Sequence, residues 1–276
     1  MTAPPGTAAP GAPVAVLTGG GGNLGRAIGE LFLARGYRLA VIDIDPDALA
    51  WAKDNPDAVA VTGDVTTPEA NAELAEAALS RFGRIDAALF NVGLAGNPGL
   101  EEDGALERYD ATMEVNVRTV VLGARAIIPI MRKARSGSIV ATASISGFGA
   151  EPGLWAYNAS KAAVINLVHA FAFDYGPYGV RVNAVCPGPI RPTHLEDRSE
   201  EVQQRYRDLA RHLPLQRVVH PKEVAEAIYF LASPAASGIT GETLQVDGGV
   251  RAGSGLFLPR QATDGPPTGH TSHRHL

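Results

Sequence analysis

The fold of this chain is decided by one stretch near its start, which reads Val14-Ala15-Val16-Leu17-Thr18-Gly19-Gly20-Gly21-Gly22-Asn23-Leu24-Gly25. Its apolar beginning is typical of a buried strand, and the residues that follow, Arg26 to Leu33, have helical periodicity. A strand, a glycine-rich turn and a helix in this order form the context of a dinucleotide site. Glycines let the backbone approach a pyrophosphate, and the helix N-terminus offers it unpaired N–H groups. A flexible glycine linker is the alternative, which the flanking strand and helix disfavour.

A second pattern pairs Tyr157 with Lys161 inside the run Trp155 to Tyr175, which is predicted to be helical. Residues four apart lie on one face of a helix. A lysine ammonium beside a phenol favours the phenolate, so we expect the pKa of Tyr157 to lie below its usual value of about 10. A tyrosine tuned in this way can exchange a proton with an alcohol or ketone oxygen.

Apolar strand candidates alternate with helical patterns along the chain. They are Val14–Thr18, Arg38–Asp43, Ala58–Gly63, Ala87–Asn91, Ser138–Ala143, Val180–Val185 and Thr243–Val246. This alternation predicts an α/β fold, a doubly wound Rossmann domain in which one parallel sheet lies between two helical layers (αβα). Ligands of such folds bind at the carboxyl ends of the strands. The polar candidates fall there: Gly19, Asp43, Asp64, Asn91 and Ser144.

Together these motifs resemble those of the short-chain dehydrogenase/reductase family, over about residues 13 to 250. The family's glycine motif is Thr-Gly-x-x-x-Gly-x-Gly, and its catalytic motif is Tyr-x-x-x-Lys. Further matches are Asn91-Val92-Gly93, Asn116, Ser144, Pro187-Gly188-Pro189-Ile190 and Asp247-Gly248-Gly249. The resemblance implies a catalytic set of Asn116, Ser144, Tyr157 and Lys161.

The resemblance also implies an NAD-dependent oxidoreductase that interconverts a small secondary alcohol and a ketone. Tyr157 would be the acid/base, Ser144 would bind the reacting oxygen, and Lys161 would stabilise the phenolate and hold the nicotinamide ribose. Asn116 would anchor a water that relays the proton. The implied cofactor contacts are Gly19, Gly22, Asn23, Leu24, Asp43, Asp64, Val65, Asn91, Gly93, Tyr157, Lys161, Ile190 and Thr193.

Asp43 favours NAD over NADP. It lies 18 residues beyond Gly25, close to the spacing for an acid that binds the adenosine ribose hydroxyls, and a carboxylate there would repel a 2′-phosphate. NADP-dependent relatives often carry a base at the positions of Gly22 or Ile44, which are uncharged here. The alternative is that Asp43 only caps the turn that follows it.

Three positions depart from the family pattern. Asn23 replaces the middle glycine of the phosphate loop, and because asparagine tolerates left-handed backbone better than most residues, we expect the turn to survive. Phe90 replaces the first asparagine of an Asn-Asn-Ala-Gly motif, which removes a structural hydrogen bond. Pro192 displaces the cofactor-binding threonine by one position, to Thr193.

The composition excludes several classes of function. The 276 residues are 45% hydrophobic and carry a formal net charge of −5, which suits one large core and argues against nucleic acid as a partner. No apolar stretch approaches the ~20 residues of a membrane span. The single cysteine, Cys186, suits a reducing compartment, and no Lys or Arg precedes Arg26 as in a signal peptide. We therefore expect a cytoplasmic protein that contacts no membrane, with Cys186 as a packed small hydrophobe.

The chain divides into one domain and two tails. Residues 1–13 and 259–276 are predicted to be disordered, because neither segment can bury enough apolar surface to offset chain ordering. Residues 14–258 form the catalytic domain, with a lid around 192–215 whose apolar residues recur at helical spacing. We expect no metal, because no carboxylate or cysteine completes a site with the tail histidines His270, His273 and His275.

Two alternative functions stay open. One is an NADH-using 3-oxoacyl thioester reductase, for which a basic cluster would dock the acyl carrier: Arg125, Arg132, Lys133 and Arg135. The other is a non-catalytic NAD-binding scaffold or sensor, which the complete catalytic set disfavours. The resemblance further implies a homotetramer that pairs helices at about Met113–Lys133 and Trp155–Tyr175. The apolar segment Leu256-Phe257-Leu258 either docks on a neighbouring subunit or folds back on its own.

Overall fold

Seven parallel strands form one sheet in the order β3-β2-β1-β4-β5-β6-β7 in the computed structural model, which describes residues 11–96, 98–253 and 259. The strands are β1 (Val14–Thr18), β2 (Arg38–Asp43), β3 (Ala58–Thr62), β4 (Ala87–Phe90), β5 (Gly137–Thr142), β6 (Val180–Pro187) and β7 (Thr243–Val246). The predicted Rossmann fold is confirmed. The predicted tails, apart from residues 11–13 and 259, and the segment Leu256-Phe257-Leu258 lie outside the described residues.

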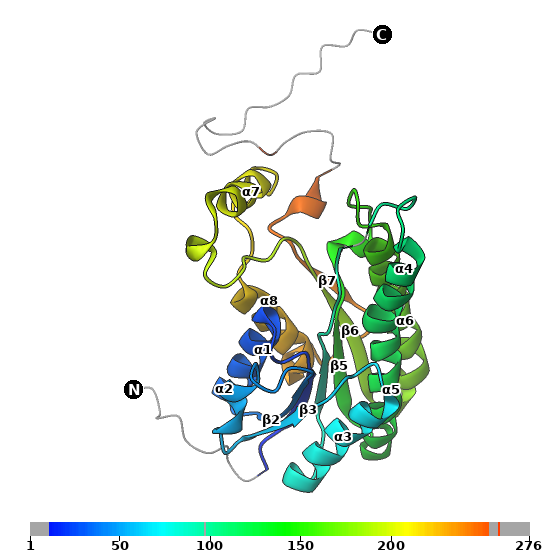
Figure 1. Cartoon of the computed structure of the whole chain (residues 1–276). Coiled ribbons are helices and arrows are strands. Elements are labelled where there is room, and N and C mark those ends of the chain that lie inside the picture. The colour runs from blue at the N-terminus through cyan, green and yellow to red at the C-terminus, as the bar shows by residue number, and fades with distance from the viewer. Residues whose placement is uncertain (1–10, 97, 254–258, 260–276) are drawn as a thin grey trace, which may run out of the picture.

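Helices cover both faces of the sheet (Figure 1). One layer holds α1 (Asn23–Ala34), α2 (Ala50–Lys53) and α8 (Pro221–Ala232), and the other holds α3 (Pro68–Phe82), α4 (Ala105–Met113), α5 (Thr119–Ala134) and α6 (Trp155–Tyr175). Short helical turns are η1 (Glu114–Arg118), η2 (Ile145–Gly147), η3 (Gly176–Tyr178), η4 (Leu195–Asp197), η5 (Pro234–Ala236) and η6 (Val250–Ala252). Because strand side chains alternate in direction, each face of the sheet has its own apolar core.

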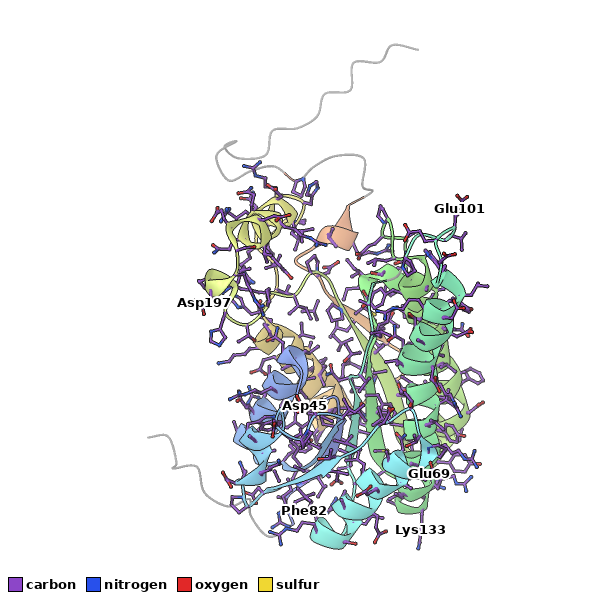
Figure 2. The ribbon with its side chains drawn as sticks, viewed as in Figure 1. Asp45, Glu69, Phe82, Glu101, Lys133 and Asp197 are labelled. Atoms are coloured by element: carbon purple, nitrogen blue, oxygen red, sulfur yellow. The ribbon has the colours of Figure 1, made fainter. Side chains whose placement is uncertain are left out.

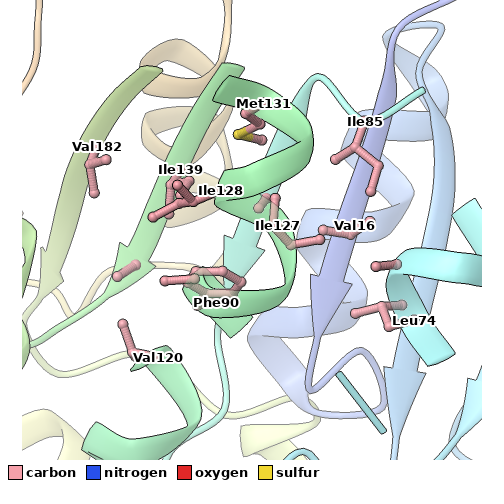
Figure 3. Close-up of a cluster of buried hydrophobic side chains, with 14 of the residues drawn as sticks. Val16, Leu74, Ile85, Phe90, Val120, Ile127, Ile128, Met131, Ile139 and Val182 are labelled. Carbon is pink, nitrogen blue, oxygen red and sulfur yellow. The ribbon is translucent and has the colours of Figure 1, made fainter. Parts of the chain in front are cut away.

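Phe90 shows how the chain manages without the asparagine of the family motif. Its ring packs in the core between β4 and α5 (Figure 3). The ring lies against Gly123 of α5, where a Cβ atom would come within 2.6 Å of Phe90 Cε1. An apolar contact with a glycine therefore fills this position in place of a polar one.

The crevice for a ligand opens where the strand order reverses, between β1 and β4. Asn91 lines this crevice. The Asn91 N–H donates to the Thr18 hydroxyl (3.0 Å), its side-chain amide donates to the Gly19 carbonyl (3.3 Å), and its amide oxygen accepts from the Thr142 hydroxyl (3.1 Å). One asparagine thus ties together the ends of three neighbouring strands, β1, β4 and β5.

The helix expected at about Met113–Lys133 is not continuous. The α-helical hydrogen bonding of α4 ends at Met113, one π-helical turn (η1) follows, and α5 resumes at Thr119. A π-turn widens the helix locally and is frequent at functional sites. It contains Asn116, one of the predicted site residues. The second expected helix, Trp155–Tyr175, is confirmed as α6.

The segment predicted to be a lid contains η4 and the helix α7 (Glu200–Arg211), which stand apart from the two helical layers (Figure 1). Asp197 at the end of η4 lies on the outer side of this segment (Figure 2). No residue of α7 is fully buried, and its apolar face of Val202, Tyr206 and Leu209 is half-buried. Leu213, after the helix, is the anchor of the segment, because it is 1% exposed and packs near Gly248.

We predict that Gly25→Ala destabilises the protein without any cofactor present. A Cβ atom at Gly25 would lie 1.9 Å from the Gly19 carbonyl oxygen, so backbone must move. The free energy of unfolding in urea should fall by about 2 kcal/mol or more. Gly22→Ala is the matched control, because its Cβ would meet only the same oxygen at 3.7 Å. Gly22→Ala should change the value by less than about 0.5 kcal/mol; equal losses in the two variants would contradict the steric argument.

Candidate active site

Two cavities meet at the carboxyl ends of the strands and share the wall residues Gly22, Asn91 and Gly93. The first, of about 380 Å³, lies over the ends of β1, β2 and β3. The second, of about 280 Å³, lies toward β5 and β6. The two cavities are therefore neighbours that share part of their walls and differ in character.

Most of the predicted cofactor contacts line these cavities. The wall of the first includes Gly19, Gly22, Asp43, Asp64, Val65, Asn91 and Gly93. The wall of the second includes Gly22, Leu24, Asn91, Gly93, Tyr157, Lys161 and Ile190, together with Ser144. Asn23 and Thr193 line neither cavity. Residues spread over most of the chain are therefore brought to one region.

Asn23 and Thr193 contact each other outside the cavity walls. The Thr193 hydroxyl donates to the Asn23 side-chain oxygen, and the Asn23 amide donates to the Arg191 carbonyl (3.1 Å). The left-handed backbone that was expected to let Asn23 replace glycine is not needed. Asn23 is the first residue of α1 and has no positive φ, and Gly19 takes that conformation with φ 70°. Asn23 links the glycine loop to the segment that follows β6.

The first cavity has an acidic wall. The Asp43 carboxylate accepts from the Gly21 N–H (2.8 Å) and from the Asp45 N–H (3.1 Å), so it holds the glycine loop as well as capping its own turn. Asp64 accepts from the Thr66 N–H (2.9 Å). Ile44 borders the same cavity with 69% of its surface exposed. No cationic side chain lies among the described residues of this wall.

Tyr157 and Lys161 lie one turn apart on α6, at the second cavity. The Lys161 ammonium is buried, donates to the Thr142 carbonyl (2.9 Å), and lies 5.6 Å from the centre of the Tyr157 ring. Ser144, which follows β5, hydrogen-bonds the phenol of Tyr157. A phenol, a hydroxyl and a cation are thus gathered at a single cavity.

The expected low pKa of Tyr157 is wrong for the protein alone. Burial raises the pKa of the phenol, and this effect exceeds the lowering by the Ser144 hydrogen bond. Burial also lowers the pKa of Lys161 to about 8. Lys161 does not lower the pKa of Tyr157 as expected, because its ammonium lies over the ring and donates to the Thr142 carbonyl. Burial also disfavours the charge of Lys161 itself.

Asn116 acts as a clamp in this structure. Its amide donates to the Leu94 carbonyl (2.9 Å) and the Ser160 hydroxyl (2.8 Å), and its oxygen accepts from the Leu94 N–H (2.6 Å). Ser160 in turn donates to the carbonyl of Tyr157 (2.7 Å). The π-turn therefore joins the loop after β4 to the helix that carries the phenol. Gly93 completes this packing, since a Cβ there would lie 3.4 Å from Lys161 Nζ.

Sequence reasoning missed three residues that shape this site. Thr142 contributes a backbone carbonyl to Lys161, which no side-chain pattern could reveal. Ser160 and Ser146 each contribute a buried hydroxyl, and Ser146 accepts from Ser144 and donates to Glu151. The one available signal was position, because Ser160 stands three residues after Tyr157 and so near the same helix face.

Other candidate groups are placed as follows. Cys186 is fully buried, and burial raises the pKa of its thiol to about 12, which confirms a packing role. Within residues 11–96, 98–253 and 259, no group of three metal-binding side chains occurs, and no helix has the length and apolarity to cross a membrane. His270, His273 and His275 lie outside these residues.

The chain resembles proteins of known sequence and structure. The sequence model of the family described as enoyl-(acyl carrier protein) reductase matches residues 21–251. The chain is 37% identical to 2-(R)-hydroxypropyl-CoM dehydrogenase of Xanthobacter autotrophicus, over 87% of this chain and 98% of that protein. The structure of levodione reductase superposes with a TM-score of 0.80 at 30% identity, covering 87% of this chain and 98% of that one. A structure of ElxO with NADP bound has a TM-score of 0.81 at 25% identity, covering 88% and 100%.

Proposed function

The chain belongs to the short-chain dehydrogenase/reductase family of oxidoreductases, and on that premise we propose that it interconverts a secondary alcohol and a ketone with NAD. The observation that carries the proposal is the gathering of Ser144, Tyr157 and Lys161 at the wall of one cavity. That cavity shares part of its wall with a second one, whose acidic wall suits an adenosine. A relative named as a hydroxypropyl dehydrogenase supports the reaction class.

The residues present fit a dinucleotide. The first turn of α1 receives no hydrogen bond from an N-cap side chain, so its N–H groups are free to bind a pyrophosphate. Gly22, the N-cap residue, is exposed, and the space around it is open except for the Gly19 oxygen. The nicotinamide end would lie in the second cavity, whose wall includes Ile190, Tyr157, Lys161, Leu24 and Gly93.

The chain's own groups divide the work of proton transfer. Ser144 and Tyr157 would both hydrogen-bond the substrate oxygen, and Tyr157 as phenolate would take the hydroxyl proton during oxidation. When bound, an oxidised nicotinamide would supply the hydride acceptor and a positive charge that favours a phenolate nearby. Lys161, held by the Thr142 carbonyl, keeps a cation beside the phenol at pH values below about 8. Asn116 would keep the helix of Tyr157 in register with the loop after β4.

The two alternatives receive less support. The basic cluster that would dock an acyl carrier lies on α5, and Lys133 stands at the end of the molecule opposite to Glu101, which precedes α4 (Figure 2). The start of β5, next to this cluster, is the amino end of a strand, whereas the cavities lie at the carboxyl ends. Arg132 and Arg135 are also engaged, with the Tyr178 ring and the Pro177 carbonyl. A non-catalytic scaffold would not need the phenol of Tyr157, the hydroxyl of Ser144 and the ammonium of Lys161 at one cavity.

Charge is the argument for NAD. The described wall of the adenosine cavity holds the carboxylates of Asp43 and Asp64 and no cation to receive a 2′-phosphate. A dianionic phosphate next to Asp43 would be repelled in a partly desolvated site. The solved relative with NADP bound shows that the shared fold also accepts the phosphorylated cofactor. The preference of this chain for NAD or NADP therefore depends on the residues that line its own adenosine cavity.

Tyr157→Phe should reduce turnover with a secondary alcohol and NAD at least about a hundredfold, because only the acid/base group is lost. A panel of secondary alcohols with the unaltered protein identifies the substrate to use. The dissociation constant for NAD should change little, and titration of NAD into the variant checks this. Near-normal turnover of Tyr157→Phe would refute the assignment of Tyr157.

NAD should bind more tightly than NADP, and Asp43→Asn should narrow the difference. The amide keeps an oxygen for the Gly21 N–H and removes the charge, so the change isolates repulsion of the 2′-phosphate. Asp43→Ala should also narrow the difference in affinity between NAD and NADP. Because it removes the acceptor of the Gly21 N–H, the glycine loop should lose some order. Asp45→Asn is the control, since Asp45 does not line the cavity. Titration of both cofactors into each protein measures the effect, and tighter binding of NADP by the unaltered protein would overturn the proposal.

We also propose a homotetramer in which the α4–α6 layer is covered by a second copy. Phe173 on α6 is 88% exposed, Leu106 on α4 is 69% exposed and Val121 on α5 is 39% exposed. Light scattering at micromolar concentration should report four copies, and Phe173→Asp should shift the mass downward because it charges this face. Leu215→Asp, also at an exposed apolar residue but in the lid segment, should leave the mass unchanged. A monomeric unaltered protein would exclude the assembly.

A further inference from the structure

A third cavity lies at the amino ends of the strands, away from the candidate active site at their carboxyl ends. Its volume is about 790 Å³, larger than that of either cavity of the candidate site. Its wall includes residues that precede or begin five of the strands: Pro13, Tyr37, Asp86, Gly137 and Val180. All predicted site residues are described by the structure, and none of them lines this amino-end cavity. Small-molecule sites commonly have volumes of about 300–1,000 Å³.

The wall of the amino-end cavity is positively charged. It includes Arg35, Arg84 and Arg181 and, among the described residues, one carboxylate, that of Asp86. The Asp86 carboxylate is already paired with the Arg84 guanidinium, at 2.6 and 2.8 Å. The chain as a whole has a formal net charge of −5, so the sign of this wall is opposite to that of the protein.

Arg181 has no carboxylate partner among the described residues. Its guanidinium instead donates to four backbone carbonyls, those of Leu231 (2.7 Å), Ile239 (3.2 Å), Ala232 (3.2 Å) and Ser233 (3.1 Å). Most of these carbonyls stand at the end of α8, so the cation also caps that helix. Burial lowers the pKa of Arg181, as expected for a desolvated cation. An anion in the cavity would be attracted to this fixed charge.

Tyr37 contributes an unused hydrogen-bond donor. Its ring is 6% exposed and packs edge-on against Phe32 and Tyr229, with centroids 5.0 and 6.0 Å apart. No described residue hydrogen-bonds the Tyr37 hydroxyl, although a buried phenol usually has a partner. Burial raises the pKa of this phenol to about 12, so the hydroxyl keeps its proton at neutral pH. Asp86 and Arg181 also act on this pKa, which places the hydroxyl near the charged wall.

The charged groups of the wall offer donors and little capacity to accept. The Asp86 carboxylate already accepts from the Val14 N–H (2.8 Å) as well as from Arg84. Arg84 uses two of its five N–H groups in that pair, and Arg35 gives one terminal nitrogen to Glu226 (2.8 and 2.9 Å). A ligand that fits this wall must therefore accept hydrogen bonds and carry negative charge.

We propose that the amino-end cavity is a second binding site, for a small organic oxyanion that accepts from the Tyr37 hydroxyl and lies near Arg84 and Arg181. The volume leaves room for an organic body besides the charged group, and the Tyr37 and Tyr229 rings give that body an apolar surface. This site lies outside the proposed function and does not depend on it.

Benzoate is the probe, and protein labelled with 3-fluorotyrosine reports its position by ¹⁹F NMR. Tyr37→Phe, Tyr229→Phe and Tyr206→Phe each remove one signal and so assign it. At constant ionic strength, benzoate should shift the Tyr37 and Tyr229 signals with a dissociation constant of about 1 mM or below, as expected for a ligand of this size. The Tyr206 signal, from α7 and outside this cavity, should not move. Benzamide has the same shape without the charge and should bind at least about tenfold more weakly.

Ser237 allows the charge of the wall to be changed without altering an arginine. It is exposed on the wall, directly after η5, and no described residue hydrogen-bonds its side chain. Ser237→Asp should weaken benzoate binding at least about fivefold by repulsion, whereas the matched neutral variant Ser237→Asn should change it less than about twofold. Tyr37→Phe keeps the ring packing and removes the donor. Followed at the Tyr229 signal, it should weaken binding about three- to tenfold, the worth of one hydrogen bond.

The titrations decide the proposal without NAD or an alcohol, so their result is separate from that of the proposed function. Saturable shifts at Tyr37 and Tyr229, with the stated losses in benzamide, Ser237→Asp and Tyr37→Phe, support the site. Equal binding of benzoate and benzamide would show an apolar hollow without anion recognition and would overturn it. Unmoved Tyr37 and Tyr229 signals up to about 10 mM benzoate overturn it as well. Binding that is unchanged in Ser237→Asp or in Tyr37→Phe would place benzoate elsewhere, with the same consequence. The dispersed ¹⁹F signals report in each sample that the variant is folded.

Discussion

The burial of one ammonium group is the constraint around which this site is arranged. Lys161 is 3% exposed, and the Thr142 carbonyl is its one hydrogen-bond partner among the described residues. An isolated buried cation is disfavoured, and its pKa accordingly falls to about 8. Because the folded state disfavours the proton, this group opposes folding below about pH 8, and the penalty is relieved as pH rises toward the ordinary value of 10.5. The fold tolerates a destabilising charge at the point where it would support a phenolate.

The packing around Lys161 shows why the neighbouring residues take the types they do. Gly147 leaves room for the backbone of α6, since a Cβ there would lie 2.9 Å from the Lys161 carbonyl, whereas a Cβ at Gly93 would lie 3.4 Å from Lys161 Nζ, at ordinary contact distance. Asn116 reaches the same helix through Ser160, from a π-turn that widens the helix where a clamp is needed. The polar residues near the phenol thus hold rigid elements together. This rigidity fixes the orientation of the groups that would react.

The sequence predicted the features that depend on local pattern. Strand bounds agree to within a few residues, and β1, β2 and β7 agree at both ends, because buried parallel strands read as apolar runs between turn residues. It could not predict what depends on distant contacts. The raised pKa of Tyr157 comes from burial by several elements, and the bonds of Asn23 reach residues 168 and 170 positions away. The hydrogen bond from Ser146 to Glu151 was hidden for another reason, since Glu151 belongs to no motif.

The departure at Asn23 illustrates how a substitution in a motif can acquire a structural use. A glycine there would have no side chain to join the phosphate loop to the segment after β6. Asparagine instead donates to the Arg191 carbonyl and accepts from the Thr193 hydroxyl, at the start of the segment that leads to η4 and α7. Its backbone needs no left-handed conformation, because Gly19, earlier in the same loop, takes that conformation. The loop that would hold the pyrophosphate and the base of the predicted lid are therefore joined by one side chain, and that side chain stands outside both cavity walls.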